Sequence, residues 1–309
     1  MITYDAVVVG AGPSGVTAAL YLCRFGIKTA LVEKVAPGGQ LLKTYEIVNY
    51  PGYPRGLEGW KLAENFDQHL QGLDLDRVLQ GVESIEGDGD AFRLHLANGD
   101  VMTGRSVIIC SGATPKKLRI PDEERLTGRG VSYCAMCDGM FFRNKTVAMV
   151  GGGNSALEEA LQLSKIVDHI YLVHRRERFR ADKVLQDKLI QNVDNITLLT
   201  GNVVTELHGD KALEAVTIQP VDGGEPQRID VKGLFVFVGN TPSAHFAPKD
   251  LARTDAGFII TDCEMRTNIP GIFAAGDIRD KLCRQVTTAV GDGATAAYAA
   301  FEYIERLQS

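Results

Sequence analysis

The sequence predicts an α/β protein in which one three-layer ββα/βαβ domain is inserted into another. Two observations indicate this architecture. A glycine-rich turn follows an apolar run twice, at Gly10 and again at Gly151, and the pattern of the first domain resumes near the end of the chain. At 309 residues the chain has room for about two domains. We expect residues 1–112 and 243–309 to form one domain and residues 113–242 the other, because insertion at an exposed loop is easily tolerated.

The first half begins with a βαβ unit. An apolar run over residues 4–9 is typical of a buried parallel strand, and a helix over 13–25 and a strand over 28–33 follow it. Residues 34–60 are rich in glycine and proline and predict a loop. A helix is expected over 60–73 with Trp60, Ala63, Phe66 and Leu70 on one apolar face. Alternating runs between 78 and 109 predict a β-meander.

The same order then restarts. A strand over 146–150, a helix over 156–166 and a strand over 169–173 are followed by a β-rich stretch over about 196–238. An apolar strand over 271–277 and a long helix over 287–307 return the chain to the first domain. The second domain therefore lies inside the first in sequence.

Charge and cysteine usage narrow the class of protein. A net charge of -6 argues against nucleic acid and against a membrane surface as partners. The start of the chain lacks a basic segment, so a secretory signal is not expected. Residues 6–23 carry no charge, but glycines and Pro13 interrupt them, which favours strand, turn and helix over a membrane span. The six cysteines are compatible with a reducing cytoplasm. We expect Cys23 and Cys110 to be buried side chains that pack in the core.

The first glycine-rich turn has the Rossmann-like dinucleotide pattern. Gly10 permits the tight turn, Gly12 lets a pyrophosphate approach, and Gly15 packs helix against strand. Glu33 ends the next strand at the expected distance of about twenty residues and can accept hydrogen bonds from a ribose. A purely structural glycine turn is the alternative. The pattern favours FAD or NAD at this site.

The second turn has a different charge. Gly151, Gly152 and Gly153 stand in the turn, Ala156 replaces the third glycine, and the next strand ends in His174, Arg175 and Arg176 instead of an acid, with Arg180 nearby. Arginine offers the charge and forked donors that a 2′-phosphate needs, which favours NADPH. A solvated cationic helix start is the alternative.

A Cys-x-x-Cys pair, Cys134 and Cys137, precedes this second turn and is followed by Asp138. Such a pair in a reducing compartment is more often catalytic or metal-binding than structural. Zinc would need two further ligands, and Cys263 and Cys283 have no partner at ligand spacing, so we expect no metal. A flavin can pass electrons from a hydride donor to a disulfide, which makes FAD the better choice at the first turn.

Taken together, these motifs resemble the low-molecular-weight thioredoxin reductases over nearly the whole chain. The resemblance rests on Gly-Ala-Gly-Pro-Ser-Gly15, Cys-Ala-Met-Cys-Asp-Gly139, Gly-Gly-Gly-Asn154, His-Arg-Arg-Glu-Arg-Phe-Arg180, Ala-Gly-Asp277 and Arg284-Gln285. It implies a cytoplasmic, homodimeric flavoprotein that reduces thioredoxin with NADPH. Met136 occupies a position that varies in the family.

The resemblance also implies the site residues. FAD would be held by Gly10, Gly12, Pro13, Ser14, Gly15, Glu33, Gly39, Gln40, Asn49, Asp277, Arg284 and Gln285. NADPH would be held by Gly151, Gly153, Asn154, Ser155, His174, Arg175, Arg176 and Arg180. Cys137 would face the flavin, Cys134 would attack the partner disulfide, and Asp138 would manage the proton.

Because the dithiol lies at the start of the inserted domain, we expect residues of about 113–242 to rotate as a rigid body between two reactions. A flavin-dependent dithiol oxidase and a ferredoxin-driven relative are the enzymatic alternatives, and neither would have much use for Arg175, Arg176 and Arg180. A flavin redox sensor with an idle dithiol is the non-enzymatic alternative.

Overall fold

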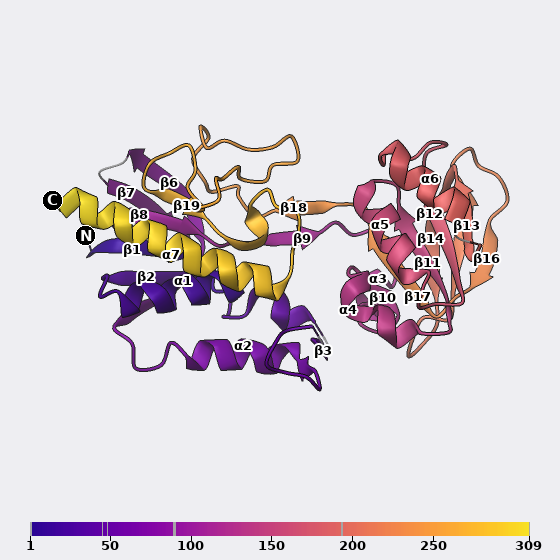
Figure 1. Ribbon diagram of the computed structural model, residues 1–309, viewed down its shortest axis with the longest axis horizontal. Coiled ribbons are helices and arrows are strands. Elements are labelled where there is room, and N and C mark those ends of the chain that lie inside the picture. The colour runs from indigo at the N-terminus through magenta and orange to yellow at the C-terminus, as the bar shows by residue number, and fades with distance from the viewer. Residues whose placement is uncertain (1, 45, 48, 89–90, 193, 309) are drawn as a thin grey trace. The chain divides into compact units, whose positions relative to one another are not determined.

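The computed structural model describes residues 2–44, 46–47, 49–88, 91–192 and 194–308. Its contacts divide the chain into two units, Met1–Thr114 with Thr241–Ser309, and Pro115–Asn240 (Figure 1). The sequence placed these divisions at 112 and 243. The connecting strands β9 (Ala113–Pro115) and β18 (Asn240–Pro242) pair with each other, so the chain enters and leaves the second unit through paired segments.

The first unit is built on a mixed sheet in the order β5-β2-β1-β8-β7-β6, with β19 also beside β8. Its parallel strands are β1 (Ile2–Val9), β2 (Thr29–Glu33), β5 (Leu75–Leu79), β8 (Val101–Ile109) and β19 (Ile272–Ala274). The antiparallel strands are β6 (Val82–Asp88) and β7 (Ala91–Leu96). The carboxyl ends of β1, β2, β8 and β19 share one edge, which is where ligands bind in such sheets.

Helices α1 (Pro13–Arg24) and α7 (Val286–Gln308) lie against each other and cover one face of this sheet (Figure 1). Ala6 and Val8 of β1 join their core, whereas Val7 and Val9 point into the core on the opposite face. Strand β1 is therefore buried on both faces, as its uninterrupted apolar run predicts. No helix within the described ranges is long and apolar enough to cross a membrane.

Three local predictions for this unit need correction. The loop predicted over 34–60 contains a 3-10 helix, η1 (Gly39–Lys43), and the short strands β3 (Glu46–Ile47) and β4 (Leu57–Glu58). The helix predicted over 60–73 is α2 (Gly59–Gln68), and Trp60 is 52% exposed while Leu62 is fully buried. Strand β5 includes Val78, which was assigned to the meander, but it pairs in parallel with β2. Pairing and burial against distant segments decided each case.

The second unit repeats the plan with a parallel sheet in the order β10-β17-β11-β12-β13. These strands are β10 (Val131–Ser132), β17 (Gly233–Phe237), β11 (Thr146–Gly151), β12 (His169–His174) and β13 (Ile196–Thr200). An antiparallel sheet of β14 (Asn202–His208), β15 (Ala215–Pro220) and β16 (Gln227–Asp230) contributes to the core on one face. The helices are α3 (Glu123–Leu126), α4 (Ala135–Asp138), η2 (Gly139–Phe142), α5 (Asn154–Leu163) and α6 (Lys183–Asn192).

Candidate active site

The glycine-rich turn of the first unit is shaped by two glycines and left open by a third. Gly10 has φ +102°, and a Cβ on Gly15 would lie 1.8 Å from the Gly10 carbonyl oxygen. A Cβ on Gly12 would meet nothing within 4 Å. Gly12 is the N-cap of α1 and offers no capping side chain. The first amides of this helix therefore have the polarity and the space to receive a phosphate group.

Glu33, the last residue of β2, is fixed beside this turn. Its Oε2 accepts a hydrogen bond from Ala11 N at 2.8 Å, and its Oε1 accepts one from Val35 N at 3.1 Å. A carboxylate has about four acceptor positions, so both oxygens keep capacity for a hydroxyl donor. The contact between Glu33 and a ribose stays a prediction. The two backbone hydrogen bonds also give Glu33 a structural role in the turn.

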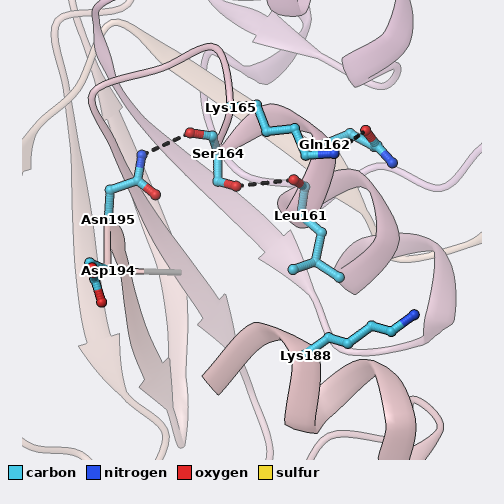
Figure 2. A pocket seen from close by; sticks show the side chains of 7 residues that line it. All are labelled: Leu161, Gln162, Ser164, Lys165, Lys188, Asp194 and Asn195. Atoms are coloured by element: carbon cyan, nitrogen blue, oxygen red, sulfur yellow. Dashed lines mark hydrogen bonds between the residues drawn. The ribbon is translucent and has the colours of Figure 1, made fainter. Parts of the chain in front are cut away.

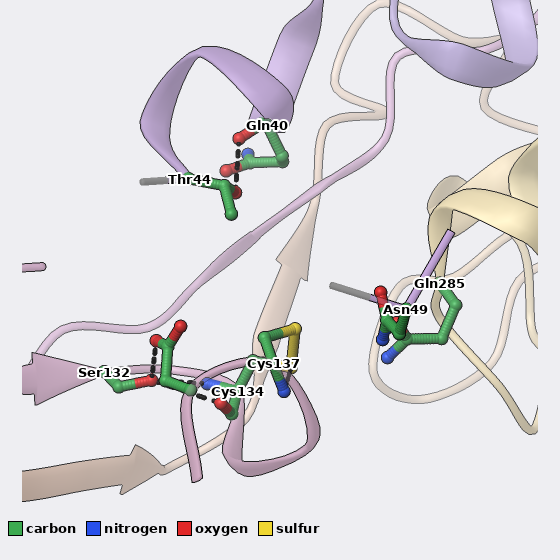
Figure 3. Close-up of a disulfide and its surroundings, with 8 residues drawn as sticks. Gln40, Thr44, Asn49, Ser132, Cys134, Cys137 and Gln285 are labelled. Atoms are coloured by element: carbon green, nitrogen blue, oxygen red, sulfur yellow. Dashed lines mark hydrogen bonds between the residues drawn. A yellow bond between two sulfur atoms is a disulfide. The ribbon is translucent and has the colours of Figure 1, made fainter. Parts of the chain in front are cut away.

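Segments distant in sequence meet at this turn. A Cβ on Gly39 would lie 3.2 Å from Gly12 Cα, and the neighbouring Gln40 donates through Nε2 to Ala113 O at 3.2 Å. Asn49 Nδ2 donates to Gln285 Oε1 at 3.0 Å (Figure 3). The predicted residues of the first unit thus come from three separate stretches of chain.

The segment after β19 completes the group, with the 3-10 helix η3 (Gly276–Ile278). A Cβ on Gly276 would lie 2.6 Å from Ser14 Oγ, so this segment approaches the start of α1 closely. The buried Oδ1 of Asp277 has no hydrogen-bond partner in the described chain. Burial raises the pKa of Asp277, and Lys281 and Arg284 act in the opposite direction. A buried acceptor left unpaired is expected where a ligand supplies the donor.

Arg284 is held in place by the protein itself. Its guanidinium carbon lies 4.2 Å from the centre of the Phe258 ring, and its nitrogens donate to Lys281 O at 3.3 Å and Arg279 O at 3.2 Å. The buried Nε of Arg284 has no partner within the described residues. Arg284 therefore combines a fixed orientation with one donor that is still available.

Asp292 is a residue of this region that sequence reasoning missed. Its Oδ2 accepts from Gly276 N at 3.1 Å and Lys281 Nζ at 2.6 Å, and its Oδ1 accepts from Arg279 Nη1 at 3.1 Å. These bonds anchor η3 to helix α7. The signal in the sequence is the pair of glycines on either side of Asp292, since each glycine inside a helix costs about 1 kcal/mol. A Cβ on Gly293 would lie 2.2 Å from Ser14 O.

The turn of the second unit uses its glycines differently. A Cβ on Gly151 would lie 2.5 Å from the Cβ of Ala156, and a Cβ on Gly152 would lie 2.2 Å from the His174 ring. Gly153 is the N-cap of α5, and a Cβ there would meet nothing within 4 Å. The open position at the helix start therefore recurs.

His174 is buried, although the sequence grouped it with the cationic side chains. It is 6% exposed, its ring stacks on Phe179 at 5.2 Å, and its Nε2 lies 3.2 Å from Arg178 O. Burial lowers its pKa, and the neighbouring arginines lower it further. Both effects favour the neutral form of the ring, which packs beneath Gly152.

The arginines themselves are exposed and are tied to the turn. Arg175, Arg176 and Arg180 are all exposed, and Arg180 N donates to Gly152 O at 2.7 Å. Asn154 Oδ1 accepts from Asp182 N at 2.8 Å, while its Nδ2 donates to Asp182 Oδ2 at 2.8 Å. Ser155 is exposed at the start of α5. The loop that carries the cationic charge is thus fastened to the open glycine turn.

The two cysteines of the Cys-x-x-Cys pair form a disulfide, with their Cα atoms 5.3 Å apart (Figure 3). Cys134 is the N-cap of α4, and its Sγ accepts from Cys137 N at 3.2 Å. Asp138 is the last residue of that helix, and its Oδ2 accepts from Ser132 Oγ at 2.5 Å. Burial raises the pKa of Asp138, and the Ser132 hydrogen bond partly offsets this. A carboxyl with a raised pKa, one residue after Cys137 in the chain, can act as a proton donor or acceptor.

The other cysteines and hollows add no chemistry of this kind. Cys110 is buried as expected, Cys23 is only partly buried, and Cys263 and Cys283 are exposed free thiols. Within the described residues, no cluster of histidine, cysteine and carboxylate side chains could hold a metal. A hollow on the second unit contains none of the predicted site residues (Figure 2). It is lined by Leu161, Gln162, Ser164, Lys165, Lys188, Asp194 and Asn195.

Residues 4–293 match the pyridine nucleotide-disulphide oxidoreductase family, and the chain belongs to this family. The thioredoxin reductase of Treponema pallidum is 39% identical over 306 residues, which are 99% of each protein. That of Listeria innocua is 41% identical over 308 residues, covering 99% of this chain and 95% of the relative. The crystal structure of thioredoxin reductase from Streptococcus pyogenes has a TM-score of 0.92 at 42% identity, covering 98% of this chain and 99% of that one. These similarities confirm the predicted fold class and the resemblance.

Proposed function

We propose that this chain is an NADPH-dependent thioredoxin reductase, in which FAD and the Cys134–Cys137 pair carry electrons to the disulfide of a thioredoxin. The observation that carries this proposal is the disulfide at the start of α4, with the partly buried Asp138 on the same short helix, in the same unit as a glycine turn flanked by exposed arginines. Similarity to thioredoxin reductases along the whole chain supports the same assignment.

The first unit fits FAD. The open position at Gly12 and the uncapped start of α1, with Gly10, Pro13, Ser14 and Gly15 around it, suit a pyrophosphate. Glu33 would hold a ribose, and the unpaired Asp277 Oδ1 would accept from the cofactor. Gly39, Gln40, Asn49, Arg284 and Gln285 would complete the set. FAD, when bound, supplies a two-electron carrier between a hydride donor and a disulfide.

The second unit fits NADPH. Gly151, Gly153, Asn154 and Ser155 would receive the pyrophosphate at the start of α5. Arg175, Arg176 and Arg180 would hold the 2′-phosphate through charge-assisted hydrogen bonds. His174 supports the turn from beneath and is proposed here as a packing residue.

The dithiol performs the transfer to the acceptor. The Cys134 thiolate attacks one sulfur of the acceptor disulfide; a new sulfur–sulfur bond forms, the acceptor bond breaks, and its electron pair leaves on the second acceptor sulfur. Asp138, protonated, gives that sulfur a proton. The resulting carboxylate takes the proton of the Cys137 thiol, which then attacks Cys134 Sγ, re-forms the enzyme disulfide and releases the first acceptor sulfur as a thiolate that solvent protonates. Burial of Asp138 favours the protonated form that this sequence requires.

We also propose that residues 113–242 rotate as a rigid body during turnover, because one dithiol must react in turn with two different partners. The self-contained core of each unit and the paired connecting strands support this motion. Gly112 and Gly239, with φ of +68° and +103°, are the hinge candidates. A cytoplasmic location and a homodimeric state are further proposals that rest on the family resemblance.

The exposed arginines separate this function from the alternatives. A dithiol oxidase that uses oxygen, or a ferredoxin-driven reductase, has little need for three arginines beside the second glycine turn. Neither alternative is favoured, and a flavin sensor would leave the dithiol idle.

Anaerobic titration with NADPH tests the proposal. The flavin absorbance should bleach rapidly, and added thioredoxin should then be reduced in proportion to the NADPH consumed. Cys134→Ser and Cys137→Ser proteins should still bleach with NADPH but lose thioredoxin reduction by at least about a thousandfold. Bleaching without transfer to any disulfide would favour the sensor, and no bleaching with NADPH would favour the oxidase or the ferredoxin-driven enzyme.

A further inference from the structure

The Ser132 hydroxyl lies at the centre of the hydrogen bonds that surround the disulfide. Ser132 is the last residue of β10 and is only 4% exposed. Its Oγ lies 2.5 Å from Asp138 Oδ2 and 3.2 Å from Cys134 O, and it accepts a hydrogen bond from Cys134 N at 3.1 Å (Figure 3). One side chain thus contacts both the carboxyl and the backbone on either side of the first cysteine.

This hydroxyl has one hydrogen for two acceptors. With Asp138 ionised, the hydrogen is donated to Oδ2, since that distance is the shorter one and the acceptor is charged. With Asp138 protonated, the acid donates to Ser132 Oγ and the hydroxyl hydrogen turns toward Cys134 O. Oγ then accepts from Asp138 and from Cys134 N while donating to Cys134 O, which uses its full capacity.

We propose that Ser132 is a positioning residue that keeps Asp138 hydrogen-bonded in both protonation states, so that this carboxyl can carry a proton to and from the dithiol. The proposal rests on the proposed function, because it concerns the proton that the sulfur exchange requires. Without the hydroxyl, one state or the other would leave a buried polar group unpaired, which is costly in a partly desolvated site.

Charged groups on neighbouring elements do not account for the behaviour of Asp138. Helix α5 contacts α4 and carries Glu158 and Glu159; the Glu159 pKa is raised by burial and by Glu158 and lowered by the Met136 amide. On α3, both Glu123 carboxylate oxygens already accept hydrogen bonds, from Leu118 N, Arg119 N and Tyr133 Oη, each at 2.8 Å. The causes that act on the Asp138 pKa are burial first and the Ser132 hydrogen bond second. Ser132 is therefore the polar side chain that, beside burial, acts on the pKa of the Asp138 carboxyl.

The test compares pH profiles of the holoenzyme with NADPH and thioredoxin. Compared with the wild-type protein, the Asp138→Asn protein should lack the limb of the rate–pH profile that reports the titration of Asp138. Ser132→Ala should move that limb up by about one pH unit and slow thioredoxin reduction about tenfold, because a hydrogen bond to the ionised form is lost. Bleaching of the flavin by NADPH should not change. Ser132→Thr and Ser132→Val have nearly the same shape, and only the threonine protein should resemble wild type, so this pair decides the question even if the alanine protein folds poorly.

Two controls isolate the effect. Ser106 is fully buried on β8 with an Oγ that has no partner in the described chain, so Ser106→Ala should leave the profile unchanged. In an Asp138→Asn background, where that limb is absent, Ser132→Ala should not slow thioredoxin reduction further. An unmoved limb in both the alanine and valine proteins, or the same loss of rate without Asp138, would overturn the proposal.

A readout without thioredoxin keeps this inference separate from the proposed function. The pH dependence of Cys134 alkylation by iodoacetamide, measured on the reduced holoenzyme by mass spectrometry, should respond to Ser132→Val but not to Ser132→Thr. If alkylation responds while the wild-type enzyme fails to reduce thioredoxin, the proposed acceptor is wrong and the role of Ser132 stands. If thioredoxin is reduced but neither the alkylation nor the turnover profile responds, only the role of Ser132 is wrong.

Discussion

The two glycine-rich turns share a framework but differ at the residues that would meet a ligand. In each, a buried parallel strand leads to an open N-cap, Gly12 or Gly153, where an added Cβ would meet nothing within 4 Å. The last residue of the following strand differs: β2 ends in Glu33, bonded to the turn, while β12 ends in His174, packed beneath it and followed by arginines. This comparison supports the proposal that the backbone of the turn receives a phosphate group while the end of the second strand selects the ribose.

The third glycine shows the same division between framework and chemistry. In the first unit Gly15 touches the Gly10 carbonyl so closely that no side chain fits. In the second unit Ala156 occupies that place, and Gly151 provides the room for its methyl group. The second turn therefore has room for one methyl group between helix and strand, whereas in the first turn the Gly10 carbonyl oxygen occupies that room.

The largest expected effect is at Gly15. Gly15→Ala should destabilise the protein by about 3 kcal/mol or more, because the new Cβ meets backbone and not a movable side chain. Gly12→Ala should leave the stability of the apoprotein unchanged while weakening FAD binding, since the space there is open. Denaturant unfolding of the apoproteins and fluorimetric FAD titration measure these quantities. Equal losses of stability for both variants would remove the distinction between framework and ligand positions.

The arginines should give the next largest effect. Replacing Arg175, Arg176 and Arg180 together by glutamine should raise the KM for NADPH about a hundredfold, because charge-assisted hydrogen bonds to the phosphate are lost. The KM for NADH should change little, as NADH has no 2′-phosphate. Arg178→Gln is the matched control, since Arg178 is exposed in the same segment and its side chain is assigned no contact with NADPH. An equal rise in the KM values for NADPH and NADH would mean that these arginines do not bind the 2′-phosphate.

Glu33 offers a smaller test of the first turn. Glu33→Gln preserves size but removes the charge that Ala11 N donates to, so FAD affinity should fall about tenfold. Asp262→Asn is a suitable comparison, because Asp262 also accepts backbone amide hydrogen bonds but lies outside this turn. Isothermal titration of the apoproteins with FAD measures the change. An FAD affinity that is insensitive to Glu33→Gln would mean that this carboxylate only braces the turn.

The smallest expected effect concerns His174 and pH. Its pKa is lowered in the folded protein, so the unfolded chain binds this proton first as the pH falls below about 6.5. The contribution of the neutral, buried ring to stability should therefore be present at neutral pH and decline with acidification. His174→Gln should flatten the pH dependence of the unfolding free energy over that window. A steeper dependence in the variant would show that the folded state prefers the charged imidazole.

The fold and much of the site could be predicted because they depend on local pattern. The apolar run of β1, the two glycine turns and the Cys-x-x-Cys pair each have a signature within a few residues of sequence. Trp60 and strand β5 were assigned incorrectly because their surroundings come from elsewhere in the chain. Ser132 and Asp292 were missed for the same reason: a serine or an aspartate has no special meaning until its neighbours are known.

By itself, the sequence predicted the order of the two units and singled out both glycine-rich turns and the Cys-x-x-Cys pair, since these follow from periodicity and from residue types at short spacing. Tertiary structure alone decided that His174 is buried beneath the turn, that Asp277 keeps an unpaired oxygen and that Ser132 contacts both Asp138 and the first cysteine. Burial and hydrogen bonding set the charge and orientation of a side chain, and both depend on atoms that lie far away in the sequence.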